Sequence, residues 1–162
     1  MANNDRYLLD QVLARRAEEV APELPGDKFF ELFVIDELLK NYALSNDELD
    51  SGLVGNGGDG GIDGIFAFVN DILLTPDFDF KGIKGTPIIH LIIIQVKQSA
   101  TYSETAVDKL VISSSDLLDL GRSITELSRR YNSQLVAVIS DYHNAVKQLA
   151  DQFPQFKFSY LW

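Results

Sequence analysis

The first part of the chain carries apolar residues at the spacing of helices. Over residues 4–21 they recur every three or four positions, and prolines and a glycine then end this predicted helix. Apolar residues surround most of the circumference of residues 27–42, so we expect a second, buried helix that is capped by Asp27. Ser45 and Glu48 have the form of a capping box and predict a short third helix.

The middle of the chain has the pattern of strands. Leu53 and Val54 predict a brief strand, and residues 62–69 alternate between two faces as a longer one. A turn at Asn70 and Asp71 is expected to lead into a short extension of the sheet over 72–74, followed by a surface loop over 75–85. Residues 88–96 are a run of β-branched and apolar residues, which is typical of a central strand covered on both faces.

Helices and strands alternate in the remainder. Capping-box patterns at 101–104 and 123–126 predict two helices. The pattern then predicts a short buried strand over 135–139, a helix over 142–153 and a last strand over 156–162, where Phe156, Phe158, Tyr160 and Trp162 alternate with other residues. This order indicates the α/β class, with a mixed sheet and helices on both of its faces.

Composition narrows the range of functions. The chain has 162 residues, 46% of them apolar, so we expect one principal domain over 27–162, preceded by a helix and linker over 1–26. A formal charge of −10 argues against a protein that coats nucleic acid through a basic surface. The absence of cysteine excludes disulfides, thiolate zinc sites and a thiol nucleophile, and favours a reducing compartment. The most apolar stretch, 88–94, is too short to cross a bilayer, so we expect a soluble, cytoplasmic protein without membrane partners.

Several motifs have an ordinary structural interpretation. Residues 55–60 satisfy the pattern GxGxxG, but strand-like residues follow them where a dinucleotide site needs a helix, so a turn with Asp59 as a turn residue is favoured. His90 and His143 are expected to be core or capping residues, and the serines of 113–115 have no paired histidine for a hydrolase. The chain also ends in an apolar strand without a polar tail, which suggests one domain of a longer protein.

A more informative group of residues comes from three separate segments of the chain. An acid on the second helix, Asp63 at the start of one strand and Gln95 at the end of the next can meet where adjacent strands end. Carboxylate and amide oxygens suit Mg²⁺, and strand alternation places Lys97 on the face of Gln95, with Val96 turned away. A lysine there can orient or deprotonate a water and stabilise the charge on a phosphate that is being attacked.

These residues resemble the PD-(D/E)XK nuclease superfamily, in the variant with a Gln-x-Lys strand. Gly-Asp-Gly-Gly-Ile-Asp-Gly over 58–64 followed by Gln-Val-Lys over 95–97 is similar to Mrr-type restriction endonucleases. The wider setting, from about Phe29 to Ser99, resembles the N-terminal part of AIPR-type proteins of abortive phage infection. The resemblance implies a restriction-endonuclease-like αβββαβ core, here with an extra N-terminal helix and a C-terminal helix and strand.

The resemblance also implies roles for individual residues. Asp63 matches the metal-binding aspartate, Lys97 the catalytic lysine, and the carbonyl of Val96 a further metal ligand. Glu31 matches the acid on the first core helix, with Glu37 as its substitute if the helix register differs. Gln95 stands where the family usually has a carboxylate, which removes one negative charge and should weaken metal binding.

The implied function is an endonuclease that requires Mg²⁺ or Mn²⁺ and hydrolyses DNA phosphodiesters, most simply in double-stranded DNA, in restriction or phage defence. A homodimer would supply the two sites needed to cut both strands. All of the net charge arises before Lys97, so phosphate contacts are expected from the neutral second part. The candidates are Lys97, Gln98, Lys109, Arg122, Arg129, Arg130 and Lys147. The alternative function is a catalytically inactive nuclease-like module that binds nucleic acid or a partner protein.

Each candidate residue also has a structural interpretation. Glu31 near a helix start would favour the helix dipole as a solvated charge. Asp63 after glycines could bond its own backbone as a turn residue, and Lys97 could end a strand by reaching water. The basic residues of the second part could be solvated helix surfaces. These interpretations make different predictions about which side chains lie together.

Overall fold

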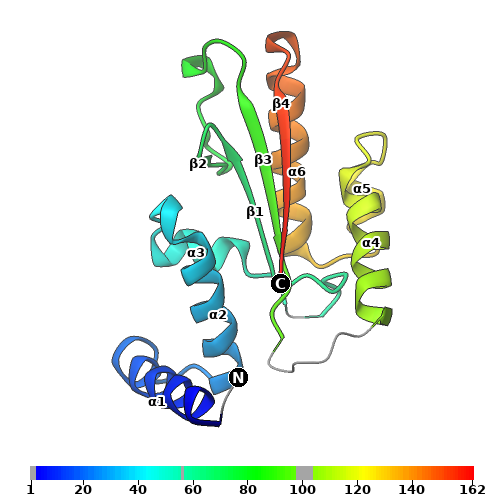
Figure 1. Cartoon of the computed structure of the whole chain (residues 1–162). Coiled ribbons are helices and arrows are strands. Elements are labelled where there is room, and N and C mark those ends of the chain that lie inside the picture. The colour runs from blue at the N-terminus through cyan, green and yellow to red at the C-terminus, as the bar shows by residue number, and fades with distance from the viewer. Residues whose placement is uncertain (1–2, 56, 98–103) are drawn as a thin grey trace.

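The computed structural model describes residues 3–55, 57–97 and 104–162 and has a four-stranded mixed sheet flanked by helices (Figure 1). This confirms the α/β class. The helices are α1 (Asn3–Val20), α2 (Gly26–Leu39), α3 (Asn46–Gly52), α4 (Glu104–Leu118), α5 (Ile124–Leu127) and α6 (Ser133–Gln148). The strands are β1 (Gly64–Val69), β2 (Ile72–Leu73), β3 (Ile88–Ile94) and β4 (Gln155–Leu161), and short 3-10 turns cover Lys40–Tyr42, Phe80–Gly82 and Ala150–Gln152.

The sheet has the strand order β2-β1-β3-β4. β1 pairs antiparallel with β2 and β3, whereas β3 pairs in parallel with β4. Asn70 and Asp71 have positive φ angles and form the tight turn between β1 and β2, as expected from two residue types that tolerate this conformation. The prediction of a central strand is confirmed, since β3 lies between two strands and is buried from Ile89 to Ile94.

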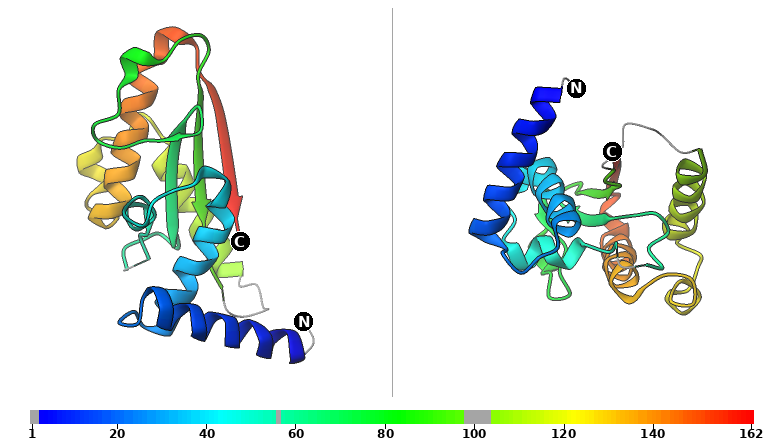
Figure 2. Two further views of the ribbon diagram at one scale, coloured as in Figure 1. Left: turned by 90° about the vertical axis from the view of Figure 1, so that its left-hand side faces the viewer. Right: turned by 90° about the horizontal axis from the view of Figure 1, so that it is seen from below.

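Strand alternation divides the core into two layers. On one face of the sheet, Ile65, Ala67 and Val69 of β1 pack with α4, α5 and α6. On the other face, Phe66 and Phe68 pack with α2 and α3. Figure 2 shows these two groups of helices on opposite sides of the sheet when the molecule is seen from below. Because both faces of β1 are covered, all six of its residues are buried.

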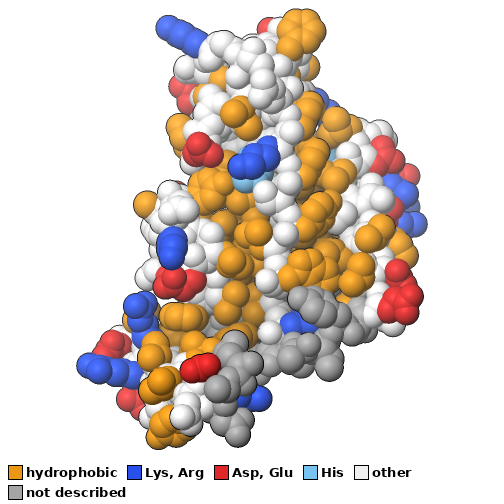
Figure 3. Space-filling view, in the orientation of Figure 1, with side chains coloured by type: hydrophobic (Ala, Val, Ile, Leu, Met, Phe, Trp, Pro, Cys, Tyr) orange, Lys and Arg blue, Asp and Glu red, His pale blue; other side chains and the backbone are white. Residues whose placement is uncertain are grey.

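The second predicted helix is less buried than its composition suggests. Phe29, Ile35 and Leu39 of α2 are buried, but Leu38 keeps 38% of its surface exposed. α2 begins one residue before Asp27, and Pro25 occupies the N-cap position without a side-chain hydrogen bond, so the predicted Asp27 cap is wrong. Part of the apolar surface of α2 contacts α1, which lies across it (Figure 2). The helix therefore packs against the sheet and against α1, neither encloses it, and hydrophobic side chains remain on the surface over these two helices (lower left of Figure 3).

The prediction of a strand over 135–139 is wrong, because these residues belong to α6. Asn132 caps this helix, its side-chain oxygen accepting a hydrogen bond from the backbone N–H of Leu135 at 2.9 Å. Val136, Ile139 and Tyr142 are buried at helical spacing against the sheet. A short run of apolar and β-branched residues fits a strand locally. The N-cap and the helical spacing of the buried residues favour a helix instead.

Some of the other local predictions are confirmed and others are not. The capping boxes of Ser45 and Ser123 are both present and begin α3 and α5. The capping residue predicted before α4, Thr101, lies outside the described residues. Leu53 makes only an isolated bridge to Gly64, so the predicted strand there is reduced to a single pairing. In the described part of the chain, no helix has the length and apolar character needed to span a membrane.

Candidate active site

The glycine-rich segment is a turn that two side chains hold by hydrogen bonds. The Asp59 carboxylate accepts hydrogen bonds from the backbone N–H groups of Gly57 and Gly61, at 3.1 and 2.7 Å, so its prediction as a turn residue is confirmed. The Asn132 side chain donates to the carbonyls of Val54 and Gly57, at 2.8 and 2.9 Å. Positive φ angles at Gly57 and Gly61 explain the glycines. Among the described residues of this segment no helix begins, and the segment leads into β1.

Asp63 lies at the end of this turn, one residue before β1. Its backbone N–H donates to the carbonyl of Ile94 at 2.9 Å and its carbonyl accepts from Val54 at the same distance. Its side-chain Oδ2 accepts from the backbone N–H of Val96 at 2.7 Å. This bond crosses to the segment after β3, so the interpretation of Asp63 as a turn residue bonded to its own backbone is wrong. The sheet holds the carboxylate in place.

The second carboxylate comes from α2. A Cβ added to Gly55 would lie 3.1 Å from Oδ1 of Asp63 and 3.7 Å from Oε2 of Glu31, so the two carboxylates converge on the space beside this glycine. Both side chains line a pocket of about 390 Å³. Glu37, the substitute for Glu31, instead pairs with Lys40 at 3.6 Å. The structure therefore places Glu31 and not Glu37 beside Asp63.

Lys28, which the sequence analysis missed, completes this group. Its ammonium donates to Oε2 of Glu31 at 2.9 Å and to the carbonyl of Gly55 at 2.8 Å. The signal was present in the sequence, because Lys28 precedes Glu31 by three positions on a predicted helix, where side chains are neighbours. Its attachment to Gly55, 27 residues away, required the tertiary structure.

The local charges favour a cation at this place. Burial raises the pKa of the Asp63 carboxyl above its ordinary value, and the Glu31 and Asp59 carboxylates act in the same direction. The hydrogen bond from Val96 and the Lys28 ammonium oppose this rise. The hydrogen bond to Glu31 raises the pKa of Lys28, which keeps it protonated. A buried carboxylate that faces a second carboxylate is stabilised when a positive charge binds between them.

Gln95 and Lys97 do not line this pocket, although Val96 between them bonds Asp63. The backbone N–H of Gln95 donates to Leu161 at 2.9 Å, and its side-chain nitrogen lies 3.9 Å from the position of a Cβ on Gly61. Its Oε1 is buried and has no hydrogen-bond partner among the described residues. The Lys97 ammonium lies 6.0 Å from the centroid of the Trp162 ring. The structure thus brings Asp63, Glu31 and the Val96 backbone together and leaves both of these side chains outside the pocket.

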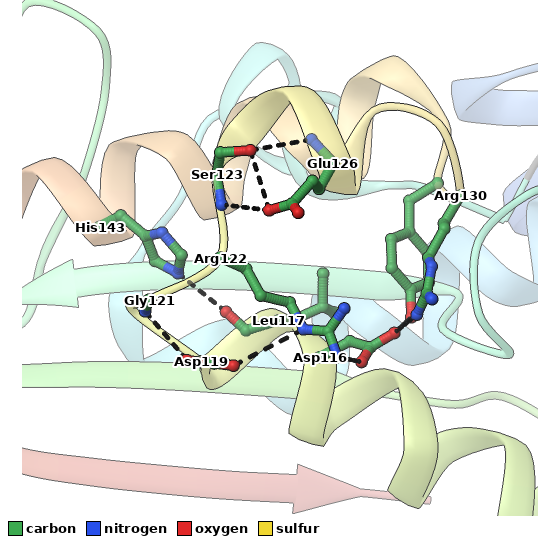
Figure 4. Close-up of polar contacts among 10 residues, drawn as sticks. Asp116, Leu117, Asp119, Gly121, Arg122, Ser123, Glu126, Arg130 and His143 are labelled. Atoms are coloured by element: carbon green, nitrogen blue, oxygen red, sulfur yellow. Dashed lines mark hydrogen bonds and ion pairs between the residues drawn. The ribbon is translucent and has the colours of Figure 1, made fainter.

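Two arginines that were predicted to contact phosphate have a partner inside the chain. Arg122 Nη2 lies 2.8 Å from Oδ1 of Asp116, and Arg130 Nη1 lies 2.6 Å from Oδ2 (Figure 4). The hydroxyl of Tyr131 donates to the same Oδ2 at 3.1 Å. These arginines are structural links between α4 and the segments around α5, and neither is simply a solvated surface charge.

Two further residues were predicted to contact phosphate. Gln98 lies outside the described residues, and Arg129 is exposed, so their contacts with phosphate stay predictions.

His90 lies between the hydroxyls of Tyr42 and Ser159, at 3.1 and 2.9 Å, and His143 Nε2 lies 2.9 Å from the carbonyl of Leu117. Both histidines are buried, as expected for core residues.

Known proteins do not identify the chain: no family model matches it, and neither the curated proteins nor the solved structures contain a match. Within the described residues, no group of three or more His, Cys, Asp or Glu side chains is arranged to hold a metal ion. A cation beside Gly55 would therefore be held by two carboxylates, with further ligands of another kind.

Proposed function

We propose that this chain is a nuclease domain of the PD-(D/E)XK type, which hydrolyses phosphodiester bonds with the help of Mg²⁺ or Mn²⁺. The observation that carries the proposal is the convergence of the Asp63 and Glu31 carboxylates beside Gly55, next to the Val96 backbone after β3. Two of the acids that the family resemblance implies, 32 positions apart in the sequence, lie in one pocket.

The order of elements supports the same proposal. From α2 onward the chain has a helix, the three strands β1, β2 and β3, further helices and the strand β4, with α3 inserted before β1. With β4 as its last strand, this order supports the αβββαβ core that the resemblance implies. Residues 135–139, which were expected to form that strand, belong to α6, so the expectation of an additional C-terminal helix and strand beyond the core is wrong. The carboxylates lie at the end of β1 that adjoins the end of β3, which is where the resemblance expects the site.

The residues fit a hard divalent cation. A glycine at position 55 leaves open the space that a Cβ would fill between two carboxylate oxygens, and carboxylate oxygens are preferred ligands of Mg²⁺. Asp63 and Glu31 would hold the ion, with the Val96 carbonyl as a further ligand. Gln95 does not line this pocket, so its amide oxygen, which is buried and has no hydrogen-bond partner among the described residues, is not assigned to the ion. When bound, the ion supplies Lewis-acid polarisation of a phosphoryl oxygen and a more acidic bound water.

The side chains of the pocket have separate tasks in this proposal. The Val96 N–H fixes one oxygen of Asp63, which leaves the other directed at the space beside Gly55. Lys28 supplies positive charge at the pocket wall, where it can contact a phosphate oxygen. Lys97 keeps its proposed role as an ammonium that assists the attacking water, for which it would have to turn from the Trp162 ring, 6.0 Å away, toward the bound phosphate. DNA is the proposed substrate, in a restriction or phage-defence setting.

Cleavage of supercoiled plasmid tests the proposal. We expect nicking by the wild-type chain with Mg²⁺ or Mn²⁺, no nicking with EDTA, and a loss of at least about 100-fold in Asp63→Asn, since this removes a charge from the cation site. Asp77→Asn, which changes an exposed aspartate, is the matched control and should keep full activity. Equal cleavage by the wild type and Asp63→Asn would refute the assignment.

The alternative is a nuclease-like module that binds nucleic acid or a partner protein without cleavage. The observation that favours it is the position of Gln95, which is neutral and does not line the pocket. Such a module has no need of a metal ion. Calorimetric titration with Mn²⁺ separates the two functions, because the nuclease predicts binding that Asp63→Asn abolishes and the module predicts none.

A further inference from the structure

Lys28 occupies an unusual place for a basic residue. It lies in the first turn of α2, where the helix dipole disfavours a positive charge. The chain nevertheless holds its ammonium at 2.9 Å from Glu31 and at 2.8 Å from the Gly55 carbonyl, with 37% of its side-chain surface exposed. Two acceptors from different segments fix this group, and one of them is a carboxylate of the candidate cation site.

The contacts explain why a positive charge is favourable beside Gly55. The Asp63 and Glu31 carboxylates face the same space beside Gly55 and repel each other when both are ionised. Lys28 attracts both charges, strongly through its direct bond to Glu31 and more weakly at Asp63. The Arg15–Glu19 and Lys40–Glu37 pairs each join one acid to one base at the surface, whereas Lys28 neutralises part of an acid pair that lines a pocket.

We propose that Lys28 is the resident counter-ion of the Glu31 and Asp63 pair, and that a divalent cation binds by displacing its ammonium from Glu31. This inference rests on the proposed function, since it concerns the same cation site. Oε2 of Glu31 is the oxygen that bonds Lys28, and it is also the Glu31 oxygen that faces the space beside Gly55, 3.7 Å from the position of a Cβ there. The ammonium and the ion therefore compete for one atom, while the Gly55 carbonyl keeps the released ammonium in the pocket.

Calorimetric titration with Mn²⁺ tests the competition without any measurement of cleavage. Lys28→Met keeps the aliphatic stem and removes the charge, so we expect it to bind Mn²⁺ about fivefold more tightly than the wild type. Lys40→Met is the matched control, because Lys40 pairs with Glu37 in the same i, i+3 arrangement outside the pocket. This variant should bind Mn²⁺ with the wild-type affinity.

The outcomes distinguish the inference from the function on which it rests. Equal or weaker Mn²⁺ binding by Lys28→Met than by the wild type would overturn the competition and leave the metal site intact. Absence of Mn²⁺ binding in the wild type and in both lysine variants would overturn the metal site itself, and the competition with it. Tighter binding by Lys28→Met alone supports both.

A measurement without metal tests the counter-ion. We expect Lys28→Met to lower the thermal unfolding midpoint, because it leaves two carboxylates facing each other, and we expect Glu31→Gln in the same chain to restore it. If Lys28→Met and the double variant unfold at the same lowered temperature, the lysine contributes only through packing and the counter-ion role is wrong.

Discussion

Asp63 and Asp116 are two largely enclosed aspartates with opposite surroundings. Asp116 is 7% exposed, and its oxygens receive two guanidinium groups and a tyrosine hydroxyl. Burial alone would raise its pKa, but the hydrogen bonds from Arg130 and Tyr131 and the charge of Arg122 hold the pKa below its ordinary value. Burial raises the pKa of Asp63, whose side chain accepts one backbone hydrogen bond and faces another acid.

The difference separates a structural charge from one that is open to a ligand. Both oxygens of Asp116 have strong donors, so its negative charge is compensated within the chain. Asp63 directs Oδ1 at the space beside Gly55, in a pocket. An aspartate that remains destabilised in the folded chain is a better candidate for cation binding than one that the fold has already neutralised.

The largest expected effect on stability is that of Asp116→Asn. We expect the free energy of unfolding to fall by about 2 kcal/mol, because two arginines lose their shared carboxylate, although the exposure of Arg130 limits the loss. Urea unfolding at neutral pH measures this, with Asp108→Asn on the exposed face of the same helix as control. If the two variants unfold at the same urea concentration, Asp116 is not the structural charge that its contacts indicate.

Asp63→Asn should have the opposite sign. Asparagine retains an oxygen for the Val96 N–H and loses the charge that faces Glu31, so we expect the unfolding free energy to rise by about 0.5 kcal/mol in metal-free buffer. The same urea experiment with EDTA present measures this. A loss of stability comparable to that of Asp116→Asn would show that the Asp63 charge is needed for the fold.

The stability contributions of Asp116 and Asp63 should depend on pH in opposite ways, because their two pKa shifts have opposite directions. The lowered pKa of Asp116 means that its contribution is present above about pH 4 and is lost as the pH falls through the folded-state pKa. The raised pKa of Asp63 means that its ionisation costs stability as the pH rises from about 4 through the folded-state pKa. We therefore expect the deficit of Asp116→Asn to shrink on acidification and the advantage of Asp63→Asn to vanish, as measured by unfolding at several pH values.

Gly55→Ala is expected to change stability least, by less than about 0.5 kcal/mol, since the backbone there is not in the left-handed region. Its methyl group would lie 3.1 Å from Oδ1 of Asp63, in the space proposed for the cation, so Mn²⁺ affinity should fall about tenfold. Gly82→Ala is the matched control, because a Cβ there meets nothing within 4 Å. Unchanged Mn²⁺ affinity in Gly55→Ala would place the cation elsewhere.

Sequence reasoning succeeded where short-range patterns act alone. The apolar, β-branched run of β3 is typical of a covered strand, and the capping boxes of Ser45 and Ser123 begin helices by bonds within four residues. It failed at 135–139, where five apolar residues fit both a strand and one buried side of a helix. Asn132 caps that helix and also anchors the glycine turn, and only the second role depends on distant residues.

The candidate site shows the same division. The sequence singled out Asp63 and Glu31 through a family resemblance, and the structure places both carboxylates beside Gly55. The acid that Arg122 and Arg130 share could not be predicted, because the local sequence of a helix does not show which side chain of another segment packs beside it. The positions of the Gln95 and Lys97 side chains depend on how the chain leaves β3, where strand alternation no longer applies.

By itself the sequence determined the class of fold, the central strand and the glycine turn, because periodicity, caps and turn residues act over a few positions. The two acids were singled out by the family resemblance. The tertiary structure decided which charges meet. It gave Asp116 two arginines and gave Asp63 a second carboxylate, with Lys28 held between Glu31 and Gly55. The balance between burial and partners sets the state of a charged group, and that balance exists only when distant segments pack together.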